Sequence, residues 1–185
     1  MKTSFLSRSE LMEMGFASVG ECVQISRFAQ FYGIESISLG SHCRIDDFCI
    51  LSGDIQVGRY SHISAYTALY GSGTIRIGDF SGLSPRCTVF SAMDDFSGQF
   101  LIGPTLPAEY TNVTKGPVVI EQYCQIGAGS IVFPDLSIGE GSVVGAMSLV
   151  KASLDAWGIY AGIPAVFKKE RQKEILNYDV NKLLK

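Results

Sequence analysis

The stretch that decides the fold is IEQYCQIGAGSIVFPDLSIGEGSVVGAMSLV, residues 120–150. Within it an aliphatic residue recurs at every sixth position, from Ile120 to Val150. Two residues before each later aliphatic position stands a second, small or aliphatic residue: Cys124, Ser130, Leu136, Ser142 and Ser148. A fixed period over several units is typical of a stacked repeat protein. Each unit is expected to form a short strand with its first and third residues inside, and three units complete one triangular coil.

The same period begins at Val19, so residues 19–166 are predicted to form one repeated structure. Before it, Ser7-Arg8-Ser9-Glu10 has the spacing of a capping box, which predicts a short helix within residues 1–18 that covers the open end of the stack. After it, the C-terminal segment 167–185 is expected to form a last helix, from Glu170 to Leu184.

Composition favours one compact soluble domain, because 46% of the 185 residues are hydrophobic and only 18% are charged. A net charge of −3 without blocks of like charge disfavours nucleic acid and anionic membrane surfaces as partners. Glu10 and Glu13 interrupt the N-terminal apolar positions, so this segment is not a signal peptide, and no apolar run has spanning length. A cytoplasmic location is expected.

The cysteines follow the period. Four of the five are predicted to occupy the small inward position, where a thiol behaves as a compact hydrophobe: Cys43, Cys49, Cys87 and Cys124. Cys22 alone falls in a corner. A disulfide framework or a metal site is the weaker interpretation, because neither a Cys-x-x-Cys spacing nor a histidine cluster accompanies them, and no metal is expected.

Three insertions interrupt the period. The corners between Phe31 and Ile37 and between Leu69 and Ile75 have two extra residues each, and a loop occupies residues 90–117. Counting three units per coil places all three insertions on one edge of the prism. Long loops inside a regular solenoid are uncommon and usually functional, so this edge is predicted to carry function.

The repeats, the long loop, the segment Ile126-Gly127-Ala128-Gly129-Ser130 and the ending Tyr160-Ala161-Gly162-Ile163-Pro164-Ala165 together resemble the hexapeptide-repeat acyltransferases. The resemblance covers residues 19–168. It implies an all-β fold, a left-handed parallel β-helix. It also implies a homotrimer, with acetyl-CoA or another acyl-CoA as cosubstrate in the groove between neighbouring helices.

The resemblance places the pantetheine arm of the cofactor along corners of small residues, which the period stacks on one edge: Gly127, Ala128, Gly145 and Ala146. Such corners let a ligand approach the backbone, although corners favour Gly in any case. A bulky side chain at Gly145 is expected to fill the groove and leave the fold intact. The resemblance implies further cofactor contacts at Ser84, Gly162, Pro164 and Lys168.

The acceptor is expected to be an amine. The similar galactoside and maltose acetyltransferases carry a general-base histidine in the long loop, and this loop has none. An alcohol must lose its proton as it attacks a thioester, whereas a neutral amine is already nucleophilic. Residues 44–49, 91–98 and 153–160 resemble acyltransferases of nucleotide-linked 4-amino-4,6-dideoxyhexoses in surface-polysaccharide pathways, including lipopolysaccharide O-antigen synthesis. The partner expected from this resemblance is a dTDP-linked amino sugar.

The candidate catalytic residues are His62, Asp94 and Asp95. The period places His62 outward between Arg44 and Gly82, where it would act as a base or contact the sugar nucleotide. An exposed histidine is often merely solvated, and paired aspartates in a loop are often turn residues. The candidate substrate-binding residues are Arg44, Arg86, Glu109 and Tyr110.

Two other functions stay open at this point. One is O-acetylation of a sugar hydroxyl, and the other is a non-catalytic repeat protein that only binds. A carbonic anhydrase built on the same repeat needs three histidines around a metal, and the chain has two.

Overall fold

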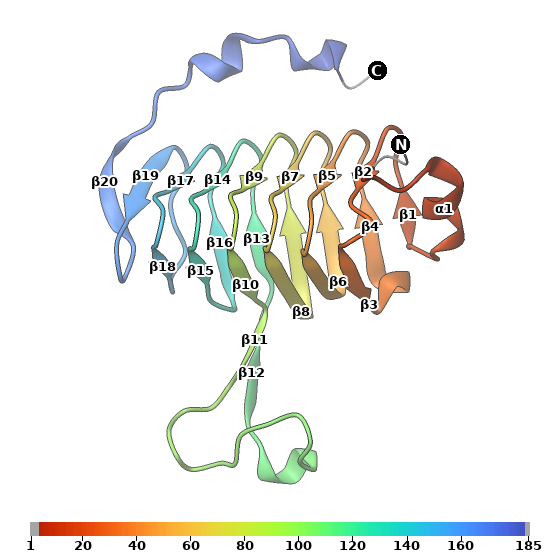
Figure 1. Cartoon of the computed structure of the whole chain (residues 1–185). Coiled ribbons are helices and arrows are strands. Elements are labelled where there is room, and N and C mark those ends of the chain that lie inside the picture. Colours follow the sequence, from red (N-terminus) through yellow and green to blue (C-terminus); the bar gives the residue numbers. More distant parts are fainter. Residues whose placement is uncertain (1–3, 184–185) are drawn as a thin grey trace.

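The computed structural model describes residues 4–183 and is a β-solenoid of about seven turns with three faces (Figure 1). The first face carries β2 (Gln24–Ile25), β5 (Arg44–Ile45), β7 (His62–Ile63), β9 (Gly82–Leu83), β14 (Gln125–Ile126), β17 (Val143–Val144) and β19 (Gly158–Ala161). The second carries β3 (Gln30–Tyr32), β10 (Thr88–Phe90), β15 (Ile131–Val132), β18 (Leu149–Val150) and the first halves of β6 (Ile50–Val57) and β8 (Ala68–Ile77). The third carries β1 (Ser18–Val19), β4 (Ile37–Leu39), β13 (Val118–Ile120), β16 (Leu136–Ile138) and the second halves of β6 and β8.

Three edges separate these faces. We call the corners between the first and second faces the groove edge (46–49, 64–67, 84–87, 127–130, 145–148). The corners between the second and third faces are the loop edge (33–36, 53–54, 71–74, 91–117, 133–135). The corners between the third and first faces are the tail edge (40–43, 58–61, 78–81, 121–124, 139–142).

The insertions lie on one edge, as predicted. β3 and β4 both pair in parallel with β6, and β10 and β13 both pair in parallel with β8. β6 and β8 continue across the loop edge as single strands. In the coil before β6 the chain crosses this edge through the turn η1 (Ile34–Ser36), and in the coil after β8 it crosses through the long loop. That loop projects from the prism as an antiparallel ribbon of β11 (Ala92–Asp94) and β12 (Val113–Lys115), followed outward by η2 (Ala108–Tyr110) (Figure 1).

The core confirms the six-residue phase. The aliphatic positions are buried from Ile25 onward, and the side chains of Ile45, Leu69 and Ile126 are fully inaccessible, while Val19 in the first coil is partly buried. The small positions hold the four buried cysteines and buried hydroxyls, while Cys22 is exposed. Several of these hydroxyls donate to a carbonyl in the next coil: Ser61 Oγ donates to Gly78 O at 2.8 Å and Ser142 Oγ to Asp155 O at 2.7 Å. Among the described residues, no fully buried side-chain nitrogen or oxygen is left without a hydrogen-bond partner.

The corners hold a feature that the sequence analysis missed. Bulky residues rarely adopt a positive φ, which costs roughly 1–2 kcal/mol per residue. Here they do so in two columns, where their rings stack from coil to coil. On the tail edge the rings of His42, Tyr60, Phe80 and Tyr123 stack with centroids 4.5, 5.3 and 5.5 Å apart. On the groove edge the positive-φ residues are Phe48, Tyr66 and Arg86: the rings of Phe48 and Tyr66 stack, and Arg86 lies over the Tyr66 ring. Phe28, which has no positive φ, stacks on Phe48 in the corner before them.

The two ends of the solenoid are covered differently. The helix α1 (Arg8–Glu13) forms at the predicted place, with the Ser7–Glu10 capping box complete, and buries Leu11 against the first coils. At the other end β20 (Val166–Glu170) pairs antiparallel with β19. Residues 1–3, part of the predicted N-terminal cap, lie outside the described chain.

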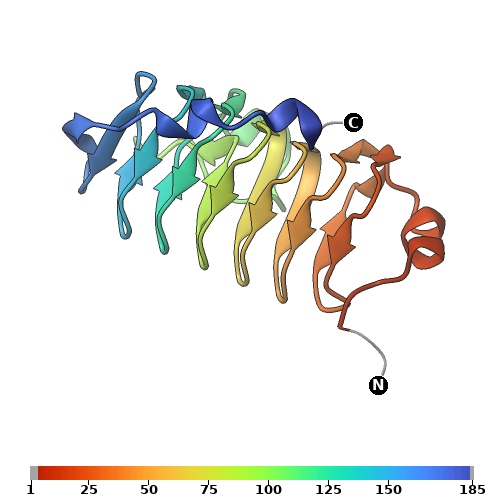
Figure 2. The same cartoon turned by 90° about the horizontal axis from the view of Figure 1, so that it is seen from above.

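The prediction of a C-terminal helix from Glu170 is wrong. The β19–β20 pairing takes up the backbone groups through Glu170, and Arg171 then donates to the carbonyls of Tyr123 and Gly141. Beyond it only the short turns η3 (Glu174–Asn177) and η4 (Val180–Lys182) form. The tail runs back along the tail edge, where the Tyr60 hydroxyl donates to Leu183 O at 2.6 Å (Figure 2). Contacts with the corners thus replace a helix; Leu184 lies outside the described residues.

The buried thiols predict a loss of stability at high pH. Burial raises the pKa of Cys43 to about 12 and those of Cys49, Cys87 and Cys124 to about 11. A raised native pKa means that the stabilisation is complete below the unfolded value near ~8.5 and is lost as pH rises toward the native value. Each thiol should therefore lower the free energy of unfolding by about 1.4 kcal/mol per pH unit in that window.

Urea unfolding between pH 8 and 10.5 measures this slope. The variant Cys43→Ala serves as the control, because it removes one titrating thiol and should show a shallower slope. A thiol reagent at pH 8 should modify one cysteine per native chain, Cys22, and an immediate reaction of all five would contradict the assignment.

Candidate functional site

The corners expected to receive the cofactor do stack on the groove edge. Ser84 N donates to Ile126 O, Gly127 N to Val144 O at 2.7 Å, and Gly145 N to Tyr160 O at 2.8 Å. The coils approach so closely here that a Cβ at Gly127 would collide with the backbone nitrogen of Ala146. Glycine at this corner is therefore required by the fold as well as by any ligand.

A hollow of about 510 Å³ follows this edge, lined by Ala65, Tyr66, Pro85, Arg86, Ala128, Gly129, Ala146 and Met147. The turn at Gly162 is tied to the last corner of this edge, because Gly162 N donates to Ser148 Oγ at 3.0 Å. Pro164 follows in the same turn, and Lys168 lies exposed on β20 beyond it. The structure therefore brings Ser84, Ala128, Ala146 and Gly162 together on one edge. It places Lys168 on β20, at the end of the first face and outside the lining of the hollow.

The expectation for Gly145 needs correction. A Cβ at this position would lie 2.9 Å from the Cβ of Ala161 in the next coil, which cannot move aside. A bulky residue would therefore strain the stack as well as fill the groove. Ala146, its exposed neighbour, points into the hollow without that conflict.

Ser84 is oriented by its neighbour on the first face. Gly82 has no side chain, and Gln125 fills the space above it. From there Gln125 Nε2 donates to Ser84 Oγ at 3.0 Å. Because the oxygen of Ser84 already accepts, its own hydroxyl hydrogen is directed away from Gln125. Among residues 4–183 no side chain or carbonyl accepts that hydrogen, so it is available to a ligand.

His62 points outward between Arg44 and Gly82, as predicted. Its Nε2 lies 2.7 Å from Asp46 Oδ2, and Arg44 Nε donates to Asp46 Oδ1 at 2.6 Å. Partial burial of Asp46 opposes ionisation, but the hydrogen bonds from Arg44 and His62 outweigh it and lower the pKa of this carboxyl. His62, on the first face, is thus held by the Asp46 carboxylate of the groove edge, away from the long loop of its own chain.

The long loop forms a second pocket, of about 660 Å³, between its ribbon and the loop edge. Its lining consists of Tyr70, Ser72, Phe90, Ala92, Met93, Asp94, Gly103, Pro104, Leu106, Ala108, Thr111, Val113 and Lys115. Asp94 is half-buried in this wall, and no described residue bonds to its side chain. Lys115 was not among the predicted residues.

The two adjacent aspartates differ. Asp95 accepts from Ser97 N at 2.6 Å and from Asn112 Nδ2 at 3.0 Å, and these bonds lower the pKa of its carboxyl. It is thus a turn residue that holds the loop together. Glu109 and Tyr110 lie exposed on η2 and are outside the pocket lining. Arg86 lies on the groove edge, so the four predicted substrate residues do not meet within one chain.

Within residues 4–183, no three His, Cys, Asp or Glu side chains lie close enough to hold a metal ion. No helix in the same range is long and apolar enough to cross a bilayer.

Comparison with known proteins identifies the family. No protein-family model matches the chain. The dTDP-4-amino-4,6-dideoxy-D-glucose acyltransferase of Escherichia coli is 42% identical over 179 residues, 95% of this chain and 93% of that protein. The S84C mutant of AntD, an N-acyltransferase from Bacillus cereus, was solved with dTDP-4-amino-4,6-dideoxyglucose and coenzyme A. It is 50% identical, with a TM-score of 0.95 over 100% of this chain and 98% of that one. AntD with dTDP and 3-hydroxybutyryl-CoA is 51% identical, with a TM-score of 0.94 over 98% and 97% of the two chains.

The solenoid and its groove are those of an acyl-CoA-dependent acyltransferase. Within that class, the chain belongs to the hexapeptide-repeat N-acyltransferases of nucleotide-linked amino sugars.

The groove edge yields a prediction. Ala146→Trp should abolish binding of acyl-CoA, because its side chain fills the hollow from an exposed corner and leaves the core intact. Ala156→Trp, an exposed alanine on the tail edge, is the matched control and should bind normally. Calorimetric titration with coenzyme A measures the affinity. Unchanged affinity in Ala146→Trp, with a normal melting temperature, would place the cofactor elsewhere.

Proposed function

We propose that this protein transfers an acyl group from acyl-CoA to the 4-amino group of dTDP-4-amino-4,6-dideoxyglucose. The observation that carries the proposal is the loop pocket, which offers the acceptor an unpaired, half-buried carboxylate and no histidine. The ligands of the related AntD structures, this amino sugar and coenzyme A, support the same chemistry. Acyl-CoA and nucleotide sugars are cytoplasmic metabolites, so the reaction is assigned to the cytoplasm.

The reaction requires little from the protein beyond the placement of the two reactants and the acceptance of one proton from the ammonium. The amine nitrogen attacks the thioester carbonyl carbon, the tetrahedral intermediate expels the thiolate of coenzyme A, and the nitrogen loses a proton that the thiolate accepts. Holding the two reactants together supplies most of the acceleration in such a case. The hydroxyl of Ser84, oriented by Gln125, is suited to donate to the oxygen that becomes negative in the intermediate.

Asp94 is suited to bind the acceptor ammonium. An unpaired carboxylate near an amine favours its charged form and fixes its position, and it also accepts the proton as the nitrogen becomes nucleophilic. Two solved AntD variants, S84A and D94N, replace a serine and an aspartate that have the same residue types and numbers as Ser84 and Asp94 here. His62, which is tied to Asp46 on another face, is assigned no part in the chemistry.

The positions of the two half-sites support a homotrimer as part of the proposal. Ser84 and the cofactor hollow lie on the groove edge, whereas Asp94 lies on the loop edge, at the other border of the second face. Three copies that turn their second faces toward a common axis bring the groove edge of each against the loop edge of the next. This closed arrangement completes three sites.

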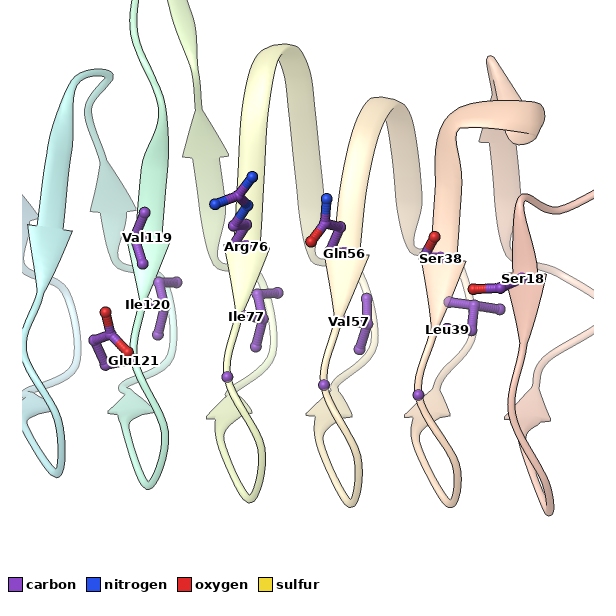
Figure 3. A pocket seen from close by; sticks show the side chains of 13 residues that line it. Ser18, Ser38, Leu39, Gln56, Val57, Arg76, Ile77, Val119, Ile120 and Glu121 are labelled. Carbon is purple, nitrogen blue, oxygen red and sulfur yellow. The ribbon is translucent and has the colours of Figure 1, made fainter.

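The composition of the faces agrees with this packing. Four of the six residues in the central outward column of the second face are apolar, Ile50, Ala68, Ile131 and Leu149, and the other two are Gln30 and Thr88. Ile131 remains 38% exposed in the single chain. The third face carries Ser38, Gln56 and Arg76 around a hollow of about 550 Å³ and has the polar character of a solvated surface (Figure 3).

The assay that tests the function compares acyl transfer to dTDP-4-amino-4,6-dideoxyglucose with transfer to its 4-hydroxyl counterpart. The amine should be acylated and the alcohol should not. Asp94→Asn should then lower kcat/KM for the amine by about a hundredfold to ten-thousandfold, the range of acid–base assistance. Transfer to the alcohol at a comparable rate would replace the proposal with O-acylation.

Two matched variants separate Asp94 from the other candidates. Asp95→Asn should lower loop stability and cost much less rate, because its partners Ser97 and Asn112 belong to the loop itself. His62→Ala should keep nearly full activity. A large loss at His62 with normal turnover of Asp94→Asn would move the site to the first face.

The assembly has its own test. Ile131→Lys places a charge at the centre of the second face and should convert trimers to monomers in sedimentation velocity, with loss of activity. Val143→Lys makes a similar change on the outward side of the first face and should leave the trimer intact. A fully active monomer would contradict both the oligomer and the shared site.

A further inference from the structure

The ribbon at the base of the loop brings two opposite charges into one pocket. In its register Asp94 lies opposite Val113, and Ala92 lies opposite Lys115. Residues directly opposed in an antiparallel pair, and residues two apart on one strand, point to the same side. These four residues therefore share one side of the ribbon, and all four line the loop pocket.

The charges are held apart by the backbone. Asp94 and Lys115 are diagonal neighbours across the ribbon, so their backbones lie about 7–8 Å apart. They form no ion pair with each other, and no residue in 4–183 forms a side-chain hydrogen bond or salt bridge with either group. Two opposite charges that no described side chain pairs with, carried on one ribbon, suit a ligand that has a cation at one end and an anion at the other.

The rest of the pocket is largely apolar. The rings of Tyr70 and Phe90 stack with centroids 5.4 Å apart at an angle of 17°, next to Met93 and Leu106. Flat aromatic surfaces accommodate the apolar face of a pyranose ring, and a 6-deoxy sugar adds a methyl group where other hexoses have a hydroxyl. The lining thus matches the middle of the ligand as well as its two ends.

We infer that Lys115 binds the pyrophosphate of the sugar nucleotide while Asp94 holds the amino group. The ribbon thereby selects sugars by the distance between their amino group and their phosphate. This inference rests on the proposed function. In a hexopyranose C1 and C4 lie at opposite ends of the ring, so a 4-amino group and the anomeric phosphate span it fully. A 2-amino group lies beside C1 and does not reach both charges. Lys115 is therefore a specificity-determining residue.

The variant Lys115→Met keeps the length of the side chain and removes its charge. It should raise KM for dTDP-4-amino-4,6-dideoxyglucose by about tenfold to a hundredfold, the effect of one charge-assisted hydrogen bond, with kcat changed little. Free 4-amino-4,6-dideoxyglucose has no phosphate, so its kcat/KM should be equal in wild type and Lys115→Met. Lys115→Arg should restore most of the affinity. Lys151→Met, the same change at an exposed lysine outside the pocket, is the control.

Equal losses on the nucleotide-linked and free sugars, or no loss on either, would overturn the inference. So would efficient acylation of a dTDP-linked 2-amino sugar. Calorimetry with dTDP alone keeps the test independent of turnover: affinity should fall by the same factor in Lys115→Met and remain unchanged in Lys151→Met. If wild type binds dTDP through Lys115 but acylates no amino sugar, the proposed function fails while the phosphate site stands.

Discussion

The narrowness of the triangular interior is the constraint on which this structure depends. Each strand has room for one small and one aliphatic side chain. Where the small residue is a serine, threonine or cysteine, its hydroxyl or thiol must also find a hydrogen-bond acceptor inside the prism. Ser130 Oγ donates to Gly145 O, and the thiol of Cys49 lies 3.2 Å from Ser64 O. Side-chain hydrogen bonds thus join successive coils inside the prism, in parallel with the backbone ladders outside. The interior fixes the spacing of the coils, and with it the spacing of everything on the edges.

The sequence could predict what the interior controls. A period of six identified the buried positions, the buried cysteines and the shared edge of the insertions, because a side chain that is too large inside stops the coil from closing. The positive-φ corners were less visible. Glycine is the usual residue for this conformation, and here aromatic residues such as Tyr60 and Phe80 take it and recover the cost by stacking on the next coil. Their position directly before a small buried residue was the available signal.

The functional site could be predicted only in part, because only some of its residues follow the six-residue period. The corners at Ala128 and Ala146 obey the period, so their alignment followed from counting. The loop does not obey it. Nothing in the sequence distinguishes Asp94 from Asp95, because the difference lies in the bonds that Asn112 and Ser97 make to the second carboxylate only. Lys115 was missed because β11 and β12 are far apart in sequence with no tight turn between them, and the register that opposes them appears only in three dimensions. The prediction of a C-terminal helix was wrong for a similar reason, since the conformation of this segment is set by β19 and by corners distant in the sequence.

The antiparallel strand β20 has one more consequence. A parallel solenoid ends in strands whose outer N–H and C=O groups are unpaired, and a second solenoid can continue the ladder from that end. β20 runs against β19 in the opposite direction, and its own exposed side bears Lys168 and Lys169. At the other end α1 lies across the first coils. Both covered ends therefore oppose end-to-end stacking of one solenoid on another, which would produce a filament. Side-by-side association of solenoids remains open.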